Sequence, residues 1–209
     1  MTSEQREIIH LLYRAGFGPA SANIEILLKK SLNEVIECGK FPKNELGKDL
    51  KTVSEILLSD DDTQVYSVSH GTFDTHVKQK GKQEKLLKSL GDSLKTFVNA
   101  MIENQKFNEV CILNFSEFSR RVYENGSDGT DHGEGNNLFI ICPHLNQPGV
   151  YNPLCNLEVL VNGDIGYEID FRQVYASVLE DCLLTDSTPI LNIQFEKTAH
   201  FFKNLELIV

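Results

Sequence analysis

The chain has 209 residues, and 41% of them are hydrophobic, which suits a packed globular core and excludes a disordered chain. Its formal net charge is −10 at pH 7, so nucleic acid and anionic membranes are disfavoured as partners. No stretch has the apolar length of a membrane span, and the start lacks the features of a signal peptide, which together predict a soluble, cytoplasmic protein.

The first part of the chain differs in charge from the rest. Residues 1–47 hold six basic and six acidic side chains, so the remainder carries the whole negative charge. Helical patterns fill residues 1–39, and a polar stretch with Pro42 and Gly47 follows. We therefore expect a helical N-terminal segment at 1–39, a linker at 40–49 and an α/β domain over 50–209.

Helical and strand patterns alternate beyond the linker. Residues 50–60 predict a helix, and the alternating, β-branched run at 63–69 predicts a strand. The clearest helix spans about Lys82 to Asn104, with apolar side chains at three-to-four spacing. Apolar runs at 109–115 and 137–142 predict buried strands on either side of a polar loop at 116–136. A last helix is expected over 170–184, with Asp170 as N-cap and Gln173 completing a capping box.

This order predicts an α/β fold with a mostly parallel sheet flanked by helices. In such sheets the functional loops leave the carboxyl ends of the strands. The segment 70–76 and the loop 116–136 both follow predicted strands, so we expect them to meet at one edge of the sheet. An unpaired hydrophobic edge of this sheet would favour a homodimer.

Two acid–imidazole pairs lie on these loops. Asp74 and His76 are two residues apart, so an extended backbone points both side chains to the same side. Asp131 and His132 are adjacent in "GTDHGEG", where glycine permits the positive φ angles that would turn both toward one point. Oxygen and imidazole ligands suit zinc or manganese. The alternative is an ordinary surface turn at each pair, because Asp in a Gly-rich stretch is usually a turn former.

Charged side chains flank the second pair in "SEFSRR". Arg120 or Arg121 could hold an anionic oxygen through paired hydrogen bonds, or could pair with the surrounding acids, and Glu117 is a third candidate. The sequence shows no Ser–His–Asp or G-x-S-x-G arrangement and no Gly-rich phosphate loop between strand and helix.

The five cysteines are widely spaced. Their number is odd and no C-x-x-C pair occurs, so neither a disulfide framework nor a thiolate zinc site is indicated. The pattern favours isolated core thiols in a reducing compartment. The cysteines are Cys38, Cys111, Cys142, Cys155 and Cys182.

Several ordered motifs carry a family resemblance. The stretches "VYSVSHGTFDTH", "CILNFSEFSRRVYENGSDGTDHGEGNNLFII" and "IDFRQVYASVLEDCL" together resemble the C-terminal part of the bacterial domain-of-unknown-function family DUF1501, over roughly residues 48–200. That family is similar to the alkaline phosphatase and sulfatase superfamily. The resemblance implies a mostly parallel sheet and metal-assisted hydrolysis of phosphate or sulfate esters. It implies that Asp131 and His132 match the superfamily's late Asp-His pair and that Asp74 and His76 supply the other metal.

A second resemblance lies in front of the first. The stretch "IIHLLYRAGFGPASANIEILLKKSLNEVI", residues 8–36, is similar to the opening of the domain-of-unknown-function family DUF1800. The chain thus resembles the head of one protein joined to the tail of another. Superfamily enzymes carry a Ser, Thr or Cys nucleophile in their amino-terminal half, and this chain has no matching segment. Members of the superfamily are also commonly exported.

These features leave two leading expectations and a third. The first is a metal-binding hydrolase domain, incomplete, that acts on a small anionic ester. The alternative is a non-catalytic remnant or pseudoenzyme that serves as an interaction scaffold. The third is a plain α/β domain with fortuitous Asp and His turns.

Overall fold

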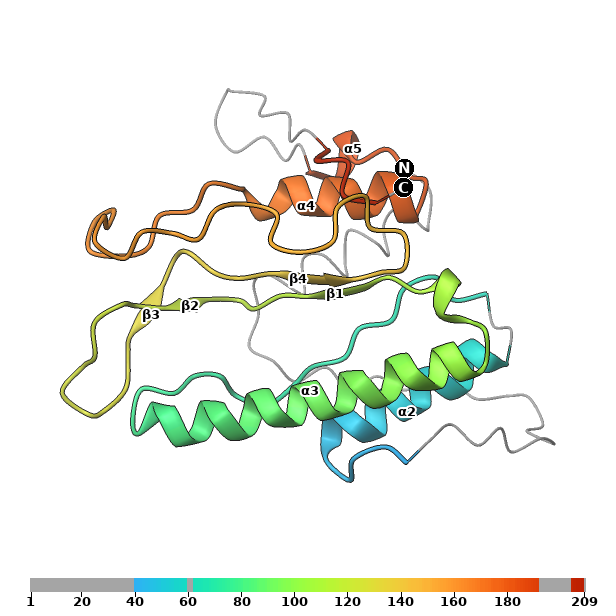
Figure 1. Ribbon diagram of the computed structural model, residues 1–209, viewed down its shortest axis with the longest axis horizontal. Helices are drawn as coiled ribbons and strands as arrows, with labels where there is room; N and C mark the ends of the chain where they lie inside the picture. Colours follow the sequence, from blue (N-terminus) through green and yellow to red (C-terminus); the bar gives the residue numbers. More distant parts are fainter. Residues whose placement is uncertain (1–39, 60–61, 192–203, 209) are drawn as a thin grey trace. The chain divides into compact units, whose positions relative to one another are not determined.

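The structure, a computed structural model, describes residues 40–59, 62–191 and 204–208 (Figure 1). The helical segment expected at 1–39, the DUF1800-like stretch and Cys38 lie outside the described residues. The chain divides into two compact units. The first takes the described residues up to His70 together with Lys88–Asn104, and the second takes Gly71–Leu87 and the described residues from Gln105 onward.

Helix α2, Glu45–Leu58, is the predicted helix at 50–60, but it begins earlier, inside the stretch expected as a linker. Asn44 explains the early start because its side chain caps the helix, accepting a hydrogen bond from the backbone N–H of Gly47 at 2.6 Å. The same side chain donates to Ser89 Oγ at 2.8 Å, within the first unit.

Helix α3, Gln79–Glu103, confirms the prediction of a long helix. Its buried face is narrower than the apolar pattern suggests, because Leu87 and Ile102 remain 55% and 53% exposed. The side chains that α3 buries most deeply are Ser93, Phe97, Ala100 and Met101.

The strands of the second unit pair in antiparallel fashion. Strand β1, Ile112–Asn114, pairs with β4, Phe139–Ile141, with Ile112 opposite Ile141 (Figure 1). Strand β2, Ser119–Arg120, pairs with β3, His132–Gly133. The expectation of a mostly parallel sheet is therefore wrong for the described residues, although helices and strands are both present. The reason lies in the segment that connects β1 to β4. Parallel strands need a crossover connection, usually a helix, whereas residues 116–136 fold back on themselves as the β2–β3 hairpin.

Of the two remaining predicted elements, the strand is absent and the last helix is present. The run 63–69 forms no strand. Helix α4, Phe171–Ser177, begins at the predicted capping box, which Asp170 and Gln173 complete, and continues as a π-helical turn over Val178–Cys182. Short helices at Phe107–Glu109 and Thr188–Leu191 (α5) complete the described elements. In the part of the chain described here, no helix is long and apolar enough to cross a bilayer.

Candidate metal centre

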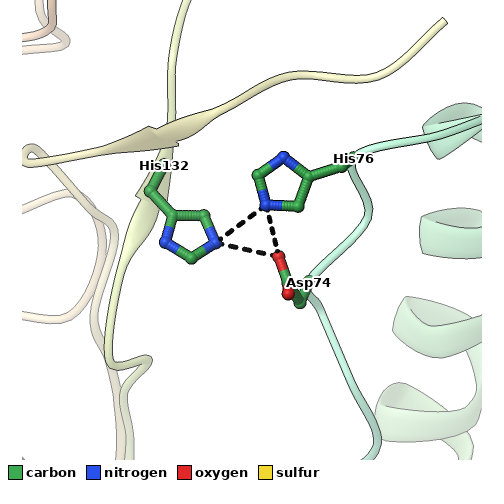
Figure 2. A group of neighbouring side chains, drawn as sticks. All are labelled: Asp74, His76 and His132. Atoms are coloured by element: carbon green, nitrogen blue, oxygen red, sulfur yellow. Dashed lines mark hydrogen bonds and ion pairs between the residues drawn. The ribbon is translucent and has the colours of Figure 1, made fainter. Parts of the chain in front are cut away.

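Three side chains of the second unit converge on one point at its surface (Figure 2). Oδ1 of Asp74 lies 2.8 Å from Nε2 of His76 and 2.8 Å from Nε2 of His132. The two Nε2 atoms lie 3.2 Å apart. One carboxylate oxygen and two imidazole nitrogens thus form a small triangle, built from loops that are far apart in the sequence.

This triangle fits a divalent cation. The three atoms lie close enough together for one ion to contact all of them at the usual ligand distance of about 2.0–2.1 Å. Three protein ligands would then hold the ion and leave a further position open, as in catalytic metal sites. The donor set, two imidazoles and one carboxylate, suits zinc or manganese. The side chains are about half exposed, so the fourth position is accessible to a small molecule.

The segment Asp74-Thr75-His76 supplies two of the candidate ligands, because it is extended and anchored by its middle residue. Thr75 is only 2% exposed, and its hydroxyl oxygen accepts a hydrogen bond from Gln83 Nε2 at 3.2 Å. Alternation along an extended backbone then turns Asp74 and His76 outward together. The expectation that these two side chains share one side is confirmed.

His132 is held by the β2–β3 hairpin and by an aromatic stack. The register places His132 opposite Arg120, so both side chains lie on the same face of the hairpin. The Phe118 ring stacks on the imidazole, with centroids 3.9 Å apart and planes within 7° of parallel. This contact fixes the ring plane of His132 and leaves its Nε2 directed at Asp74.

Backbone hydrogen bonds join the two loops that carry the ligands. The N–H groups of Lys78 and Gln79 donate to the carbonyls of Ser127 and Asp128, at 3.0 and 2.8 Å. Asn125 adds a side-chain bond, donating from Nδ2 to the carbonyl of His76 at 3.1 Å. These hydrogen bonds therefore hold the start of α3 against the loop 116–136, next to the candidate metal centre.

The glycines of "GTDHGEG" serve close packing rather than unusual backbone angles. A Cβ on Gly129 would lie 2.1 Å from the carbonyl oxygen of His76, and one on Gly133 would lie 2.7 Å from Oδ2 of Asp164. Neither glycine, nor Gly135, is among the residues with positive φ. The expectation that these glycines turn the Asp-His pair through positive φ is therefore wrong. Glycine is needed at Gly129 and Gly133 because the backbone of His76 and the carboxylate of Asp164 occupy the space that a Cβ would take.

Asp164 anchors the loop from behind. It is 5% exposed, and its carboxylate accepts hydrogen bonds from the N–H groups of Glu134, at 2.7 Å, and Ile165, at 2.8 Å. These bonds hold the chain directly after His132 in place.

Asp131, expected as a metal ligand, occupies a different position. Its Oδ1 lies 3.3 Å from Nδ1 of His76, on the opposite side of the ring from Nε2, and it also accepts from Asn125 Nδ2 at 3.4 Å. A carboxylate at Nδ1 holds the proton there and leaves the Nε2 lone pair free for a metal. The hydrogen bond from Asn125, helped by His76, lowers the pKa of Asp131 below its ordinary value.

Asp74 is the carboxylate at the centre of the group. The hydrogen bond from His132, with the charges of His76 and His132 and a contact with Arg120, lowers the pKa of Asp74 below its ordinary value. Its carboxylate is therefore ionised at neutral pH, as a cation ligand must be.

The three flanking charged candidates are separated by the structure. Arg120 places Nη1 3.4 Å from Oδ1 of Asp74, and its side chain is 14% exposed, with Nε and Nη2 enclosed and lacking hydrogen-bond partners. Arg121 is exposed and donates from Nε to the carbonyl of His132 at 3.2 Å. Glu117 is exposed, and no hydrogen bond or ion pair joins it to the described ligand residues.

Sequence reasoning missed several supporting residues. Asn125, Phe118 and Asp164 have no sequence signal beyond a turn former, an apolar side chain and the turn "NGD". Their roles arise from contacts between residues 14 to 49 positions apart, which local patterns do not reveal.

Comparison with known proteins finds a family model that matches part of the chain. Residues 48–145 match the model of a family described as Protein of unknown function (DUF1501), and all three converging side chains lie inside this range. Neither the curated proteins nor the solved structures give a match. The segment at residues 48–145, which carries the candidate metal centre, is therefore similar to the DUF1501 family.

Proposed function

We propose that the DUF1501 segment binds one divalent cation, zinc or manganese, through Asp74, His76 and His132, and that this site hydrolyses phosphate or sulfate esters. The observation that carries the proposal is the triangle of one oxygen and two nitrogens with edges of 2.8, 2.8 and 3.2 Å. The resemblance of the family to alkaline phosphatases and sulfatases supports the reaction class.

The residues around the cation have separable tasks in this proposal. Asp131 keeps the proton of His76 on Nδ1, so that Nε2 stays available as a ligand. Arg120 orients the carboxylate of Asp74 from its enclosed position. When bound, the cation would supply Lewis-acid polarisation of an ester oxygen.

We assign the contact with the anionic ester to Arg121. Its guanidinium is exposed and is fixed beside the site by the bond from Nε to the carbonyl of His132. A guanidinium binds phosphate and sulfate oxygens through paired N–H donors. Arg120, in contrast, has its Nε and Nη2 enclosed within the protein.

A non-catalytic cation site on an interaction scaffold is the second candidate. The observation that favours it is the state of Arg120, whose one directed nitrogen already contacts Asp74 and whose others are enclosed. This leaves Arg121 as the sole arginine of the "SEFSRR" motif that is exposed to an ester.

The experiment loads the full chain with zinc or manganese and measures hydrolysis of an aryl phosphate and an aryl sulfate. The proposal expects metal-dependent turnover that disappears in Asp74→Ala and persists in His144→Ala, because His144 bonds to the carbonyl of Asn108 instead. Stoichiometric metal without turnover of either ester would establish the scaffold. Absence of bound metal would exclude both candidates.

A further inference from the structure

Three of the cysteines are not isolated. Cys111 directly precedes β1 and Cys142 directly follows β4. The register of these strands places Ile112 opposite Ile141, so continuing it by one residue places Cys111 opposite Cys142. The expectation of isolated thiols is wrong for this pair.

The spacing of opposite residues suits a disulfide. Directly opposite residues of an antiparallel pair have Cα atoms about 4.5–5.5 Å apart. A disulfide needs a Cα separation of about 4.4–6.8 Å. Both thiols are free, and both residues are partly buried. If the β1–β4 register continues by one residue, the two Cα atoms come within the range that a bridge requires.

We propose that Cys111 and Cys142 are a cross-strand redox pair, whose disulfide closes the base of the loop that carries Arg120 and His132. The enclosed stretch, 112–141, contains β2, β3 and all of the loop 116–136. A bridge at its base removes conformational freedom from this entire stretch when the chain is unfolded. Oxidation would thus stabilise the loop, and reduction would loosen it.

The reaction is a thiol–disulfide exchange with a low-molecular-weight disulfide, such as oxidised glutathione. The thiolate of Cys142 attacks one glutathione sulfur and expels a glutathione thiolate, which leaves a mixed disulfide. Cys111 then attacks Sγ of Cys142, expels the second glutathione thiolate and gives up its proton to it. The two protein thiols lose two electrons and two protons, and the glutathione disulfide becomes two thiols.

Cys182 lies next to this pair and explains the order of attack. The hydrogen bond that Cys111 shares with Cys182, together with burial, raises the pKa of Cys111 above its ordinary value. The same bond lowers the pKa of Cys182. Cys111 is therefore a poor entering thiolate and acts second. Cys182 competes with Cys142 as the partner of Cys111 in a disulfide. A peptide map distinguishes a Cys111–Cys142 bridge from a Cys111–Cys182 bridge.

The test uses the full chain in glutathione buffers of increasing oxidised fraction, followed by alkylation of free thiols and a non-reduced peptide map. Trypsin leaves Cys142 and Cys155 on one peptide, because no Lys or Arg lies between Arg121 and Arg172. The Cys155→Ser variant removes this ambiguity, and it is also the matched control, since Cys155 is exposed.

We expect a peptide linking Cys111 to Cys142 in the wild type and in Cys155→Ser. We also expect Tm to rise by roughly 5–10 °C on oxidation and to return on reduction. The rise of Tm on oxidation should vanish in Cys142→Ser. If that variant does not fold, the peptide map of the wild type shows by itself whether Cys111 and Cys142 are linked. The proposal is overturned if both thiols stay alkylated at every ratio, if Cys111 links to another cysteine, or if the bridge leaves Tm unchanged.

Discussion

His76 uses both of its ring nitrogens, and this separates the ligands from the residues that support them. Nε2 faces Asp74 and His132, whereas Nδ1 faces Asp131. Asp131 and His132, although adjacent in the sequence, would therefore act at different distances from the cation. His132 would bind it directly, and Asp131 would act through the imidazole.

This division predicts the effect of removing Asp131. Asp131→Ala should weaken zinc binding by about 10–100-fold, the usual cost of losing a carboxylate behind a ligating imidazole. Asp131→Asn should cost less, because the amide oxygen can still accept the Nδ1 proton. Affinities are measured by competition with a chromophoric chelator.

Glu124→Ala provides the control, because it removes one exposed negative charge from the same loop. Equal loss of affinity in Asp131→Ala and Glu124→Ala would indicate a general charge effect and contradict the orienting role.

The tight packing at Gly129 gives a second prediction. Gly129→Ala should reduce the free energy of unfolding by roughly 1–3 kcal/mol and weaken cation binding, because the new Cβ would overlap the carbonyl of His76. The measurement is urea unfolding of the cation-free protein. Gly126→Ala, in the same loop, meets nothing within 4 Å and should be nearly neutral. Similar losses in both variants would contradict the close approach of the two loops.

At the scale of elements, the sequence predicted the long helix and the cap of α4, but it was wrong about a strand at 63–69 and about the pairing of the strands. The capping box at Asp170 and the outward direction of Asp74 and His76 were predictable, because each depends on residues two or three positions apart. The direction of β4 was not, because apolar strand runs look the same in parallel and antiparallel pairs. Long-range contacts also decided the place of Asp131, which the sequence alone paired with His132 as a ligand.

The cap of α4 gives a prediction with a pH dependence. Asp170→Ala should cost about 0.5–2 kcal/mol at neutral pH, because Asp170 caps the helix through the backbone N–H of Arg172 and also binds its guanidinium. Burial favours the protonated acid, but the bonds from Arg172 outweigh it and lower the pKa of Asp170. A lowered pKa in the folded protein means that this stabilisation is present above the ordinary pKa of Asp and is lost as the pH falls through the folded value.

Urea unfolding of wild type and Asp170→Ala at several pH values measures this effect. Their difference should be largest at neutral pH and shrink in acid below about pH 4. The exposed Glu168→Ala is the control. A difference that grows as the pH falls would contradict the role of the ionised cap.

At the scale of the whole molecule, binding of the proposed cation would be linked to folding. A cation that binds the folded chain alone stabilises it by about 2.7 kcal/mol at one hundred times its Kd. Adding zinc should therefore raise the Tm of the wild type, and a chelator should reverse the rise. His132→Ala should show no zinc-dependent change in Tm. A zinc-dependent rise that persists in His132→Ala would locate the binding elsewhere.

X-ray absorption spectroscopy of the zinc-loaded full chain tests the central claim most directly. The account predicts one zinc per chain, with two imidazole nitrogens and a carboxylate oxygen at about 2.0–2.2 Å. The His132→Ala chain should not hold zinc in this imidazole and carboxylate environment. Sulfur neighbours at about 2.3 Å would instead place the metal at the cysteines, and a spectrum without imidazole would contradict the site formed by Asp74, His76 and His132.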